Sequence, residues 1–390
     1  MKQVLFYLLI GSLFISACNN TSPKPNTKNK TVSVILPYKV DIETTVNNVK
    51  TVPLSTIGKE IEYIPLETNT KSLIKRIVKI EFSKNYIFIS DFDRLTQFDR
   101  KGKFIRQVGA NGRGPGEYIY VMEFCIDENL ERIVIKDYGN SLIKVFDFEG
   151  QYIKSFKLPF ESTNFLVKDT NSILFHLANI ADKTKDSNYS LSLTDFYGTP
   201  DIKIRKYPVR KNSLNIGKMP LYYFIDSIRF MEFGVDTLYT LKNNKLEPYV
   251  IFNLGNVKMD PDPNIPIRNP ERNVMLDQLI KKLWICDILE NKEYVFIKLK
   301  CGLSDSSKIS VFNKHTLETS FLDRNGFIND LDKGITFWPR YIYHDSILVD
   351  YQDAYKFLEI IKSNNQIVGY EGILSKGLTE TSNPVVIVVK

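Results

Sequence analysis

A short motif recurs along this chain at a fixed spacing. Residues 98–104 read Phe-Asp-Arg-Lys-Gly-Lys-Phe, and residues 146–152 repeat the pattern as Phe-Asp-Phe-Glu-Gly-Gln-Tyr, 48 residues later. Asp195 and Gly198 follow after a further 48 residues. An Asp three residues before a Gly favours a tight hairpin turn, because the carboxylate accepts turn amides and Gly adopts a positive φ. A period in the forties with strand-like flanks is typical of the blades of a β-propeller rather than of a helical solenoid.

The segments around these turns alternate in polarity as strands do. Residues 86–89 and 133–135 precede the first two turns, and residues 104–105 and 152–153 follow them, which gives four short strands in each period. Later units keep polar turn residues without the Asp and Gly. Residues 61–390, less an apparent insertion at 256–283, hold about six such periods. The sequence therefore predicts an all-β, six-bladed propeller, with seven blades as the alternative.

Two segments near the ends of the repeat region have particular roles. Residues 385–389 form an unbroken apolar run that suits a buried strand, and residues 61–66 form an early strand that we expect to join it and close the ring. Residues 271–285 break the β pattern, because Met275, Leu279 and Leu283 recur at i, i+4 and i+8. We expect one inserted amphipathic helix there, packed over a face of the ring or binding a partner.

The N-terminus predicts export. An apolar run at residues 4–10 is too short to span a bilayer and is typical of a cleaved signal peptide. The sequence Phe-Ile-Ser-Ala-Cys at 14–18 resembles a bacterial lipobox, although Ile15 stands where Leu is commoner; an ordinary signal peptide with an incidental Cys is the alternative. This resemblance implies cleavage after residue 17 and lipidation of Cys18. It predicts a protein held in the cell envelope, at the outer membrane, with residues 18–50 as a flexible tether and 51–390 as the propeller domain.

Cysteine content and charge add two expectations. Cys125 lies in an apolar strand and is expected to be a buried thiol. Cys286 and Cys301 are far enough apart to face each other across neighbouring strands, so the sequence allows a disulfide between them but does not require one. The formal net charge of +7 is modest for 390 residues, so we expect no nucleic-acid partner.

Four motifs in order resemble a known family. They are residues 61–68 (Ile-Glu-Tyr-Ile-Pro-Leu-Glu-Thr), the Gly-Pro-Gly-Glu-Tyr at 114–118, Asn-Asp-Leu-Asp at 329–332 with Phe-Trp-Pro at 337–339, and Asn-Pro-Val-Val at 383–386. Together they resemble the six-bladed β-propeller lipoproteins of uncharacterised function, and the glycine-rich loop resembles the connectors of NHL-type propellers. The resemblance implies a lipid-anchored ring and supplies no catalytic residues.

The glycine-rich loop at 109–118 gives the first candidate binding residues. No Lys-Ser or Lys-Thr follows its glycines, so a phosphate-binding loop is disfavoured and a blade connector is expected. Arg113, Glu117 and Tyr118 remain candidates for ligand contact, Arg113 above all, because its guanidinium can meet a carboxylate, a phosphate or a sugar hydroxyl.

The second group of candidates is Asn329, Asp330, Asp332, Trp338 and Arg340. Their amide and carboxylate oxygens, aromatic face and cation suit a sugar or a peptide, although aromatic core packing is the commoner use of such a Trp. Asp330 and Asp332 begin like a calcium loop, but the later ligands are missing.

No motif indicates a reaction. The three histidines lack metal-ligand spacing and no Gly-x-Ser-x-Gly occurs, so we predict no metal site and no cofactor, with calcium left open. The leading hypothesis is a binding or scaffolding module, more a binder than an enzyme, for a glycan, peptide or protein partner. The alternative is a metal-dependent enzyme of lactonase or lyase type, whose cation would be held by oxygens from separate blades.

Overall fold

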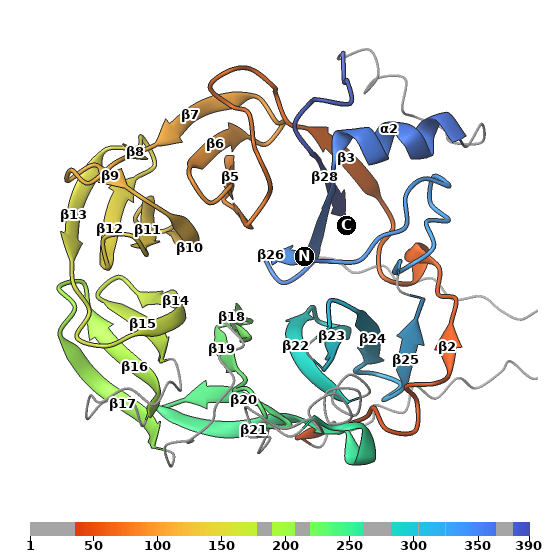
Figure 1. Cartoon of the computed structure of the whole chain (residues 1–390). Coiled ribbons are helices and arrows are strands. Elements are labelled where there is room, and N and C mark those ends of the chain that lie inside the picture. Colours follow the sequence, from red (N-terminus) through yellow and green to blue (C-terminus); the bar gives the residue numbers. More distant parts are fainter. Residues whose placement is uncertain are drawn as a thin grey trace, which may run out of the picture. The chain divides into compact units, whose positions relative to one another are not determined.

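The computed structural model describes residues 36–177, 189–206, 219–259, 282–302, 304–323, 325–363 and 377–390. Six sheets are built around four antiparallel strands each; in five of them the four strands follow one another along the chain, and in the sixth the fourth strand comes from the N-terminal part. We number them as blades I to VI. Figure 1 shows them arranged around a common centre, which confirms the six-bladed propeller and sets aside the seven-bladed alternative.

The first three blades follow the chain directly. Blade I contains β4 (Lys79–Phe82), β5 (Tyr86–Ser90), β6 (Leu95–Asp99) and β7 (Phe104–Val108). Blade II contains β10 (Val121–Asp127), β11 (Arg132–Asp137), β12 (Leu142–Asp147) and β13 (Tyr152–Phe156). Blade III contains β14 (Ser162–Asp169), β15 (Ser172–Leu177), β16 (Tyr189–Asp195) and β17 (Pro200–Lys206).

The last three blades also use strands from the N-terminal part of the chain. Blade IV contains β18 (Leu221–Phe224), β19 (Ser227–Phe230), β20 (Thr237–Lys242) and β21 (Lys245–Asn253), with β1 (Tyr38–Asp41) outside them. Blade V contains β22 (Leu283–Glu290), β23 (Tyr294–Cys301), β24 (Ser307–Asn313) and β25 (Thr319–Leu322), with β2 (Val49–Lys50) outside them. Blade VI contains β26 (Tyr341–Tyr343), β27 (Ile347–Gln352), β28 (Val385–Val389) and β3 (Ile61–Pro65).

The apolar core lies between neighbouring blades rather than at one centre. Phe88 and Leu95 of blade I, for example, are fully buried in one cluster with Phe124, Ile133 and Phe146 of blade II. Each blade is apolar on both faces because it packs against a neighbour on each side. A chain of this length can therefore bury its apolar residues in a series of local interfaces.

The repeated Asp and Gly build the turn between the third and fourth strands, as the sequence predicts. In blade I, Asp99 Oδ1 accepts hydrogen bonds from the amides of Lys101 and Lys103 at 2.8 and 2.9 Å, and Gly102 has φ +85°. Asp147 with Gly150 and Asp195 with Gly198 repeat this geometry in blades II and III. Gly102 also meets the preceding blade closely, because a Cβ there would lie 2.3 Å from the carbonyl oxygen of Pro65 in β3.

Later blades make the same turn with other residues. Asn243 and Asn244 of blade IV both have positive φ, which Asn tolerates better than most residues. In blade V, Asn313 Oδ1 accepts the amides of His315 and Thr316 at 2.8 and 3.0 Å, and Leu317 adopts φ +60°. The polar side chain is thus kept where the Gly is lost.

The ring closes between the two ends of the chain, as predicted. β28 pairs with β27 on one side and antiparallel with β3 on the other, with Ile387 opposite Tyr63. All five residues of β28 are buried. Asn383, just before it, accepts the amide of Ile74 and donates to the carbonyls of Glu67 and Ser72, each at 2.8 Å. The C-terminal strand is therefore fixed to the chain that enters blade I.

Residues 38–50, which precede strand β3 of blade VI, are more ordered than the sequence predicts. β1 runs parallel to β21, with Tyr38 opposite Val250, and β2 runs parallel to β25. Tyr38, Val40, Ile42 and Val46 are buried in the core between blades IV and V. Part of the predicted tether, from residue 38 to residue 50, is thus built into the propeller.

Most of the predicted inserted helix at 271–285 lies outside the described residues, and its last residues form a strand. Residues 271–281 lie outside the described part of the chain, and Leu283 and Ile285 belong to strand β22, so the C-terminal end of the predicted helix is wrong. The α-helix of the described residues is α2 (Ala354–Ser363), between β27 and β28. Its Phe357, Ile360 and Ile361, spaced i, i+3 and i+4, pack on the core between blades V and VI. Two short 3₁₀ turns, η1 (Leu54–Thr56) and η2 (Gly255–Val257), and the strands β8 (Ala110–Asn111) and β9 (Glu117–Tyr118) complete the elements.

The three cysteines of the described chain are free thiols. Cys125 is buried, as expected, and burial raises the pKa of its thiol to about 12. Cys286 and Cys301 do lie on neighbouring strands, β22 and β23, but the residue opposite Cys301 is Leu283 and Cys286 sits in a bulge. They are not joined by a disulfide in this structure.

A buried group of charges joins blades IV and V; we call it the Glu290 cluster, formed by Arg229, Tyr249, Glu290 and Lys314. Glu290 Oε1 accepts from Arg229 Nε at 2.7 Å, and its Oε2 accepts from Lys314 Nζ at 2.6 Å and from Tyr249 Oη at 3.0 Å. The three charged side chains are at most 7% exposed. The Arg229 guanidinium also lies 3.7 Å from the centre of the Tyr249 ring. One carboxylate is thus shared by two buried cations at a blade interface.

Candidate functional site

The meander of each blade gives the ring two chemically different faces. Turns between the first and second and between the third and fourth strands lie on one face, which we call the turn face. Turns between the second and third strands, and the segments that pass from blade to blade, lie on the other, which we call the loop face. All eight candidate binding residues predicted from the sequence lie in blade-to-blade segments or at their ends, on the loop face.

At the turn face, the turn between β26 and β27 crosses the axis of the ring. The Tyr343 hydroxyl lies 3.4 Å from a carboxylate oxygen of Glu128 in blade II, and His344 Nε2 lies 3.4 Å from the other. On the opposite side, Asp345 accepts the amide of Ile225 in blade IV at 3.0 Å. Figure 1 shows β26 close to the centre of the ring. The innermost turns of blades II, IV and VI are thus tied together at this end.

At the loop face, charged side chains of the innermost strands gather near the axis between blades I and II. Lys79 of β4 forms ion pairs with Glu81 at 2.7 Å and with Glu123 of β10 at 2.5 Å. Burial acts to lower the pKa of the Lys79 ammonium, but the carboxylates of Glu123 and Glu81 outweigh it and raise that pKa well above its usual value. Lys79 is therefore a fixed cation at the start of the first blade.

Lys136 of β11 lies in the same region but has a different environment. Its ammonium donates to the carbonyl and the hydroxyl of Ser162 and lies 4.3 Å from the centre of the Tyr138 ring. Burial lowers the pKa of Lys136 to about 8, although Glu161 and Glu123 oppose this. We call Lys79, Glu81, Glu123, Lys136 and Tyr138 the axial cluster.

Arg340 stands at the loop-face end of β26, in blade VI. Its Nε lies 2.8 Å from Asp350 Oδ1, its guanidinium lies over the Tyr351 ring at 4.4 Å, and the side chain is 46% exposed. Burial raises the pKa of Asp350 to about 6 even though the Arg340 guanidinium acts in the opposite direction. The Arg340 side chain, a predicted candidate for ligand contact, is thus paired within the fold and still about half exposed to solvent.

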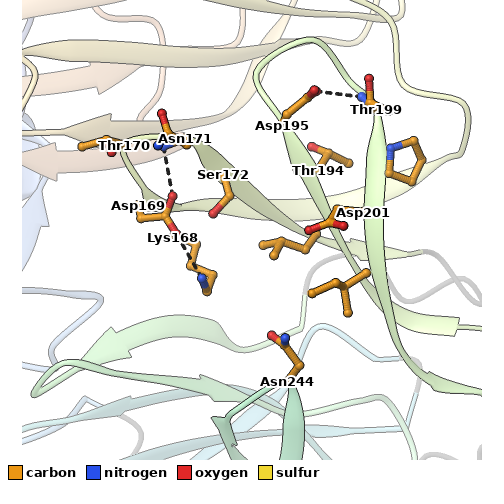
Figure 2. Close-up of a pocket in the computed structure, with 13 residues that line it drawn as sticks. Lys168, Asp169, Thr170, Asn171, Ser172, Thr194, Asp195, Thr199, Asp201 and Asn244 are labelled. Carbon is orange, nitrogen blue, oxygen red and sulfur yellow. Dashed lines mark hydrogen bonds and ion pairs between the residues drawn. The ribbon is translucent and has the colours of Figure 1, made fainter.

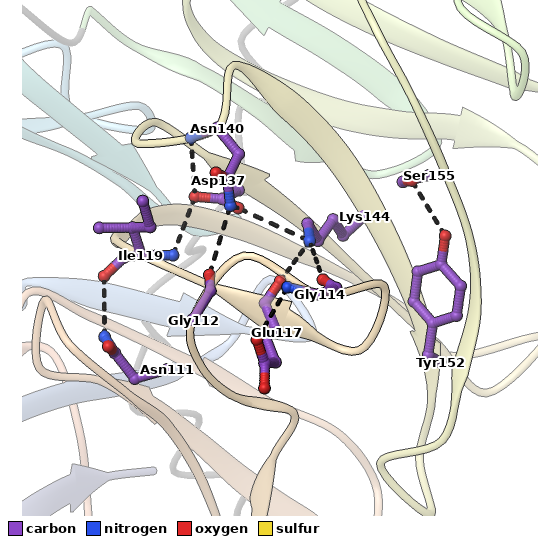
Figure 3. A network of polar contacts seen from close by, with 10 residues as sticks. All are labelled: Asn111, Gly112, Gly114, Glu117, Ile119, Asp137, Asn140, Lys144, Tyr152 and Ser155. Atoms are coloured by element: carbon purple, nitrogen blue, oxygen red, sulfur yellow. Dashed lines mark hydrogen bonds and ion pairs between the residues drawn. The ribbon is translucent and has the colours of Figure 1, made fainter.

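The glycine-rich loop joins β7 of blade I to β10 of blade II, so the predicted blade connector is confirmed. A buried lysine holds it. Lys144 of β12 is 1% exposed, and its ammonium donates to the carbonyls of Gly114, at 2.9 Å, and Glu117, with Asp137 3.8 Å away (Figure 3). A Cβ at Gly112 would lie 2.1 Å from the Glu117 carboxylate, so a larger residue there would displace that carboxylate from the loop.

The three candidates in this loop have different fates. Glu117 Oε2 accepts the amide of Gly114 at 2.8 Å, so its carboxylate shapes the loop. Tyr118 is fully buried, and its hydroxyl donates to the Val108 carbonyl at 2.6 Å and accepts the Leu95 amide at 3.0 Å. Arg113 is exposed at the tip, and its guanidinium forms no hydrogen bond or ion pair within the described residues.

The segment from 329 to 338 lies at the periphery of blades V and VI. Asn329 donates to Asp332 at 2.6 Å and to the Tyr63 hydroxyl at 3.2 Å, and Asp330 accepts the amide of Ser55 at 2.9 Å and its hydroxyl at 2.5 Å. Trp338 is stacked on Phe327 with ring centres 6.1 Å apart. These residues fasten the N-terminal segment to the ring, and they are not brought together with Arg113.

The axial cluster was not predicted from the sequence, although charged residues in its strands pointed to it. Glu123, Lys136 and Asp350 each stand beside apolar residues inside a largely buried strand, and Lys79 and Glu81 alternate with the apolar residues of β4. A charge inside such a strand is costly unless it is paired or hydrogen-bonded. Nothing in the sequence, however, says that these strands meet at the axis.

The described residues contain neither a metal-binding cluster nor a membrane-spanning helix. No three His, Cys, Asp or Glu side chains there lie close enough to hold a metal ion. No helix of the described chain combines the length and apolar character that a membrane span requires.

The fold and the distribution of polar groups define a six-bladed β-propeller with chemically distinct faces. Residues 37–390 match the model of the DUF4934 domain, a domain of unknown function, and the chain belongs to that family. A structure of a "Putative exported protein" from Bacteroides fragilis is similar, with a TM-score of 0.70 and 21% identity over 90% of this chain and 99% of that one. A member of the DUF4221 family from Bacteroides vulgatus has a TM-score of 0.50 and 14% identity over 85% of this chain and 96% of that one. No curated protein matches the sequence.

Proposed function

We propose that this protein is an exported, lipid-anchored binding module whose loop face binds a peptide or protein partner. Export and anchoring rest on the apolar run at 4–10 and the lipobox-like sequence that ends at Cys18. The similar fold of a Bacteroides fragilis protein named as exported supports the same location. We place the anchor at the outer membrane, where the propeller would act within reach of other envelope proteins.

The observation that carries the binding role is a set of exposed side chains on the loop face, one of which, Tyr138, belongs to the axial cluster. Tyr120, Met122 and Tyr138 of the loop face are 39%, 42% and 36% exposed, although they are large and largely apolar. Arg113 and Arg340 are exposed on the same face. Tyr, Met and Arg are the residue types enriched where proteins bind one another, and exposed aromatic groups of this kind mark binding surfaces.

Met122 allows a direct test, because it lies on innermost strand β10 while Ile153 lies on β13, the outermost strand of the same blade, with similar exposure. A photo-crosslinking amino acid at position 122 of the full chain, expressed in its own cells, is expected to yield a discrete protein adduct. The same amino acid at position 153 is expected to yield none. Identical adducts at both positions, or no adduct at 122, would contradict the proposed site.

The anchor has its own test. Cys18→Ser removes the thiol that would be acylated, so the variant is expected to take up no labelled fatty acid and to move from the membrane fraction to the soluble fraction. The unchanged chain should be labelled and sediment with membranes, because each buried acyl methylene contributes about 0.8 kcal/mol of membrane affinity. Labelling of Cys18→Ser, or its retention at the membrane, would argue against lipidation at this residue.

A further inference from the structure

An open hollow of about 750 Å³ lies on the turn face, on the other side of the ring from the proposed partner site. The ends of all four strands of blade III contribute to it, and Asn244 in the β20–β21 turn of blade IV lies opposite (Figure 2). Ten of its thirteen lining residues are polar, and the rest, Leu193, Pro200 and Ile202, are apolar. The volume is in the range of natural small-molecule sites, which is about 300–1,000 Å³.

Some of the polar groups around the hollow are already engaged in the fold. Asp195 Oδ1 accepts the amides of Tyr197 and Thr199 at 2.8 and 2.9 Å. Asp169 accepts the amide of Asn171 at 2.9 Å and pairs with Lys168 at 3.0 Å. Figure 2 shows the contacts of Asp195 with Thr199 and of Asp169 with Asn171 and Lys168. These contacts fix the residues around the hollow in place, and other lining side chains stay available to bind a ligand.

Other lining side chains have no such engagement, and three of them carry the inference. Thr194 is 1% exposed, and its buried hydroxyl has no hydrogen-bond partner although the residue lines the hollow. Asp201 and Asn244 are exposed, and their side chains form no hydrogen bond or ion pair with any described residue. A buried hydroxyl without a partner is unfavourable for folding, and that of Thr194 differs from others in the ring, such as Ser192, because its residue lines a hollow in which a ligand would supply the missing bond.

The charge of the lining selects among possible ligands. Three carboxylates, of Asp169, Asp195 and Asp201, face one ammonium, of Lys168, so the walls carry a net negative charge. Phosphate, sulfate and carboxylate groups would be repelled. No group of three metal-ligating side chains occurs among the described residues, so the carboxylates do not form a metal cage there. Neutral and cationic ligands remain, and the apolar Leu193, Pro200 and Ile202 beside the polar groups favour a neutral ligand that has both hydroxyl groups and apolar ring faces.

We propose that this hollow binds a non-acidic oligosaccharide of two or three sugar units. The Asp201 carboxylate and the Asn244 amide would accept and donate hydrogen bonds to adjacent sugar hydroxyls, and the Thr194 hydroxyl would complete its unmet bond with another. Leu193, Pro200 and Ile202 would contact the apolar faces of the sugar rings. The site is separate from the loop face, so the protein would hold a glycan on one side and a protein partner on the other.

Thr194→Val is the most informative variant because it keeps the shape of the side chain and removes only the hydroxyl. Binding of maltotriose, cellotriose, mannotriose and triacetylchitotriose to the propeller is measured by calorimetry and by ligand-observed NMR. At least one of these trisaccharides is expected to bind, and Thr194→Val and Asp201→Asn are each expected to weaken it about tenfold, the loss of one good hydrogen bond. The melting temperature of Thr194→Val should be unchanged or higher.

Ser192→Ala is the matched control. Ser192 lies on the same strand, and its hydroxyl is also buried without a partner, but it does not line the hollow. It should leave sugar binding unchanged. The inference fails if none of the four trisaccharides binds, if trigalacturonate binds as well as they do, if a lysine-rich peptide competes for the hollow, or if Ser192→Ala weakens binding as much as Thr194→Val. A crosslinking residue at position 122 reports separately on the loop face.

Discussion

Removal of the strand that closes the ring is expected to abolish cooperative folding. A chain that ends at Pro384 lacks β28, whose five residues are at most 1% exposed and pair with both β27 and β3. Burial of one Val or Ile side chain contributes about 1.5–3 kcal/mol, so five contribute on the order of 10 kcal/mol. This is comparable to the whole free energy of unfolding of a typical domain, about 5–15 kcal/mol.

The loss should be seen in several measurements. The truncated chain is expected to lack a sigmoidal urea transition and a near-ultraviolet circular dichroism signal, because blade VI would present two open strand edges and blades I and V would lose their neighbour. A chain that ends at Val389 is the control. It lacks only Lys390, which pairs with Glu60 and Glu62 at the surface, and should unfold nearly as the full chain does. Cooperative unfolding of the shorter chain would show that the ring does not depend on β28.

The second large effect is expected at the Glu290 cluster. Glu290→Ala removes the carboxylate that both Arg229 and Lys314 use, and leaves these two buried cations without the negative charge of that carboxylate. Breaking a buried ion pair from one side costs about 3–5 kcal/mol of unfolding free energy, and here one carboxylate serves two cations. Chemical denaturation of the purified propeller measures the difference.

Glu293→Ala is the matched control, because Glu293 is exposed in the turn three residues later and should change stability by less than about 0.5 kcal/mol. A triple variant with Met at 229, 290 and 314 tests the cause. It removes all three charges, so it should recover much of the loss if unpaired charge is the reason. Equal stability of Glu290→Ala and Glu293→Ala would mean that the cluster does not hold blades IV and V together.

Several local features were predictable because neighbouring residues determine them. The Asp and Gly of the first three blades supply a carboxylate for the turn amides and a residue with positive φ, and both requirements can be read within a few positions. The closing strand at 385–389 was also predictable, since an apolar run without alternation has to be buried on both faces. The helix at 271–285 was mispredicted at its C-terminal end, because the apolar residues at 283 and 285 suit a buried strand equally well.

The candidate site was predictable only in part. The sequence singled out the glycine-rich loop and residues 329–340, and these do lie on the loop face, but Tyr118, Glu117 and Asn329 are engaged within the fold. Motif reading favours residues that stand out locally, and residues that hold an unusual loop stand out as much as those that bind a ligand. Thr194 was not predicted as a site residue, because nothing in the sequence around it distinguishes it from other Thr residues in strands.

The sequence by itself determined the blade, its turns and the joining of the two chain ends, because each depends on hydrogen bonds and apolar patterns within one period or on a single buried strand. Only the tertiary structure decided which side chains meet. The axial cluster and the Thr194 hollow each combine residues from different strands or blades, and the Glu290 cluster joins residues up to 85 positions apart, Arg229 and Lys314. Contacts of this kind depend on the angle and distance between packed sheets, and these produce no periodic pattern in the sequence.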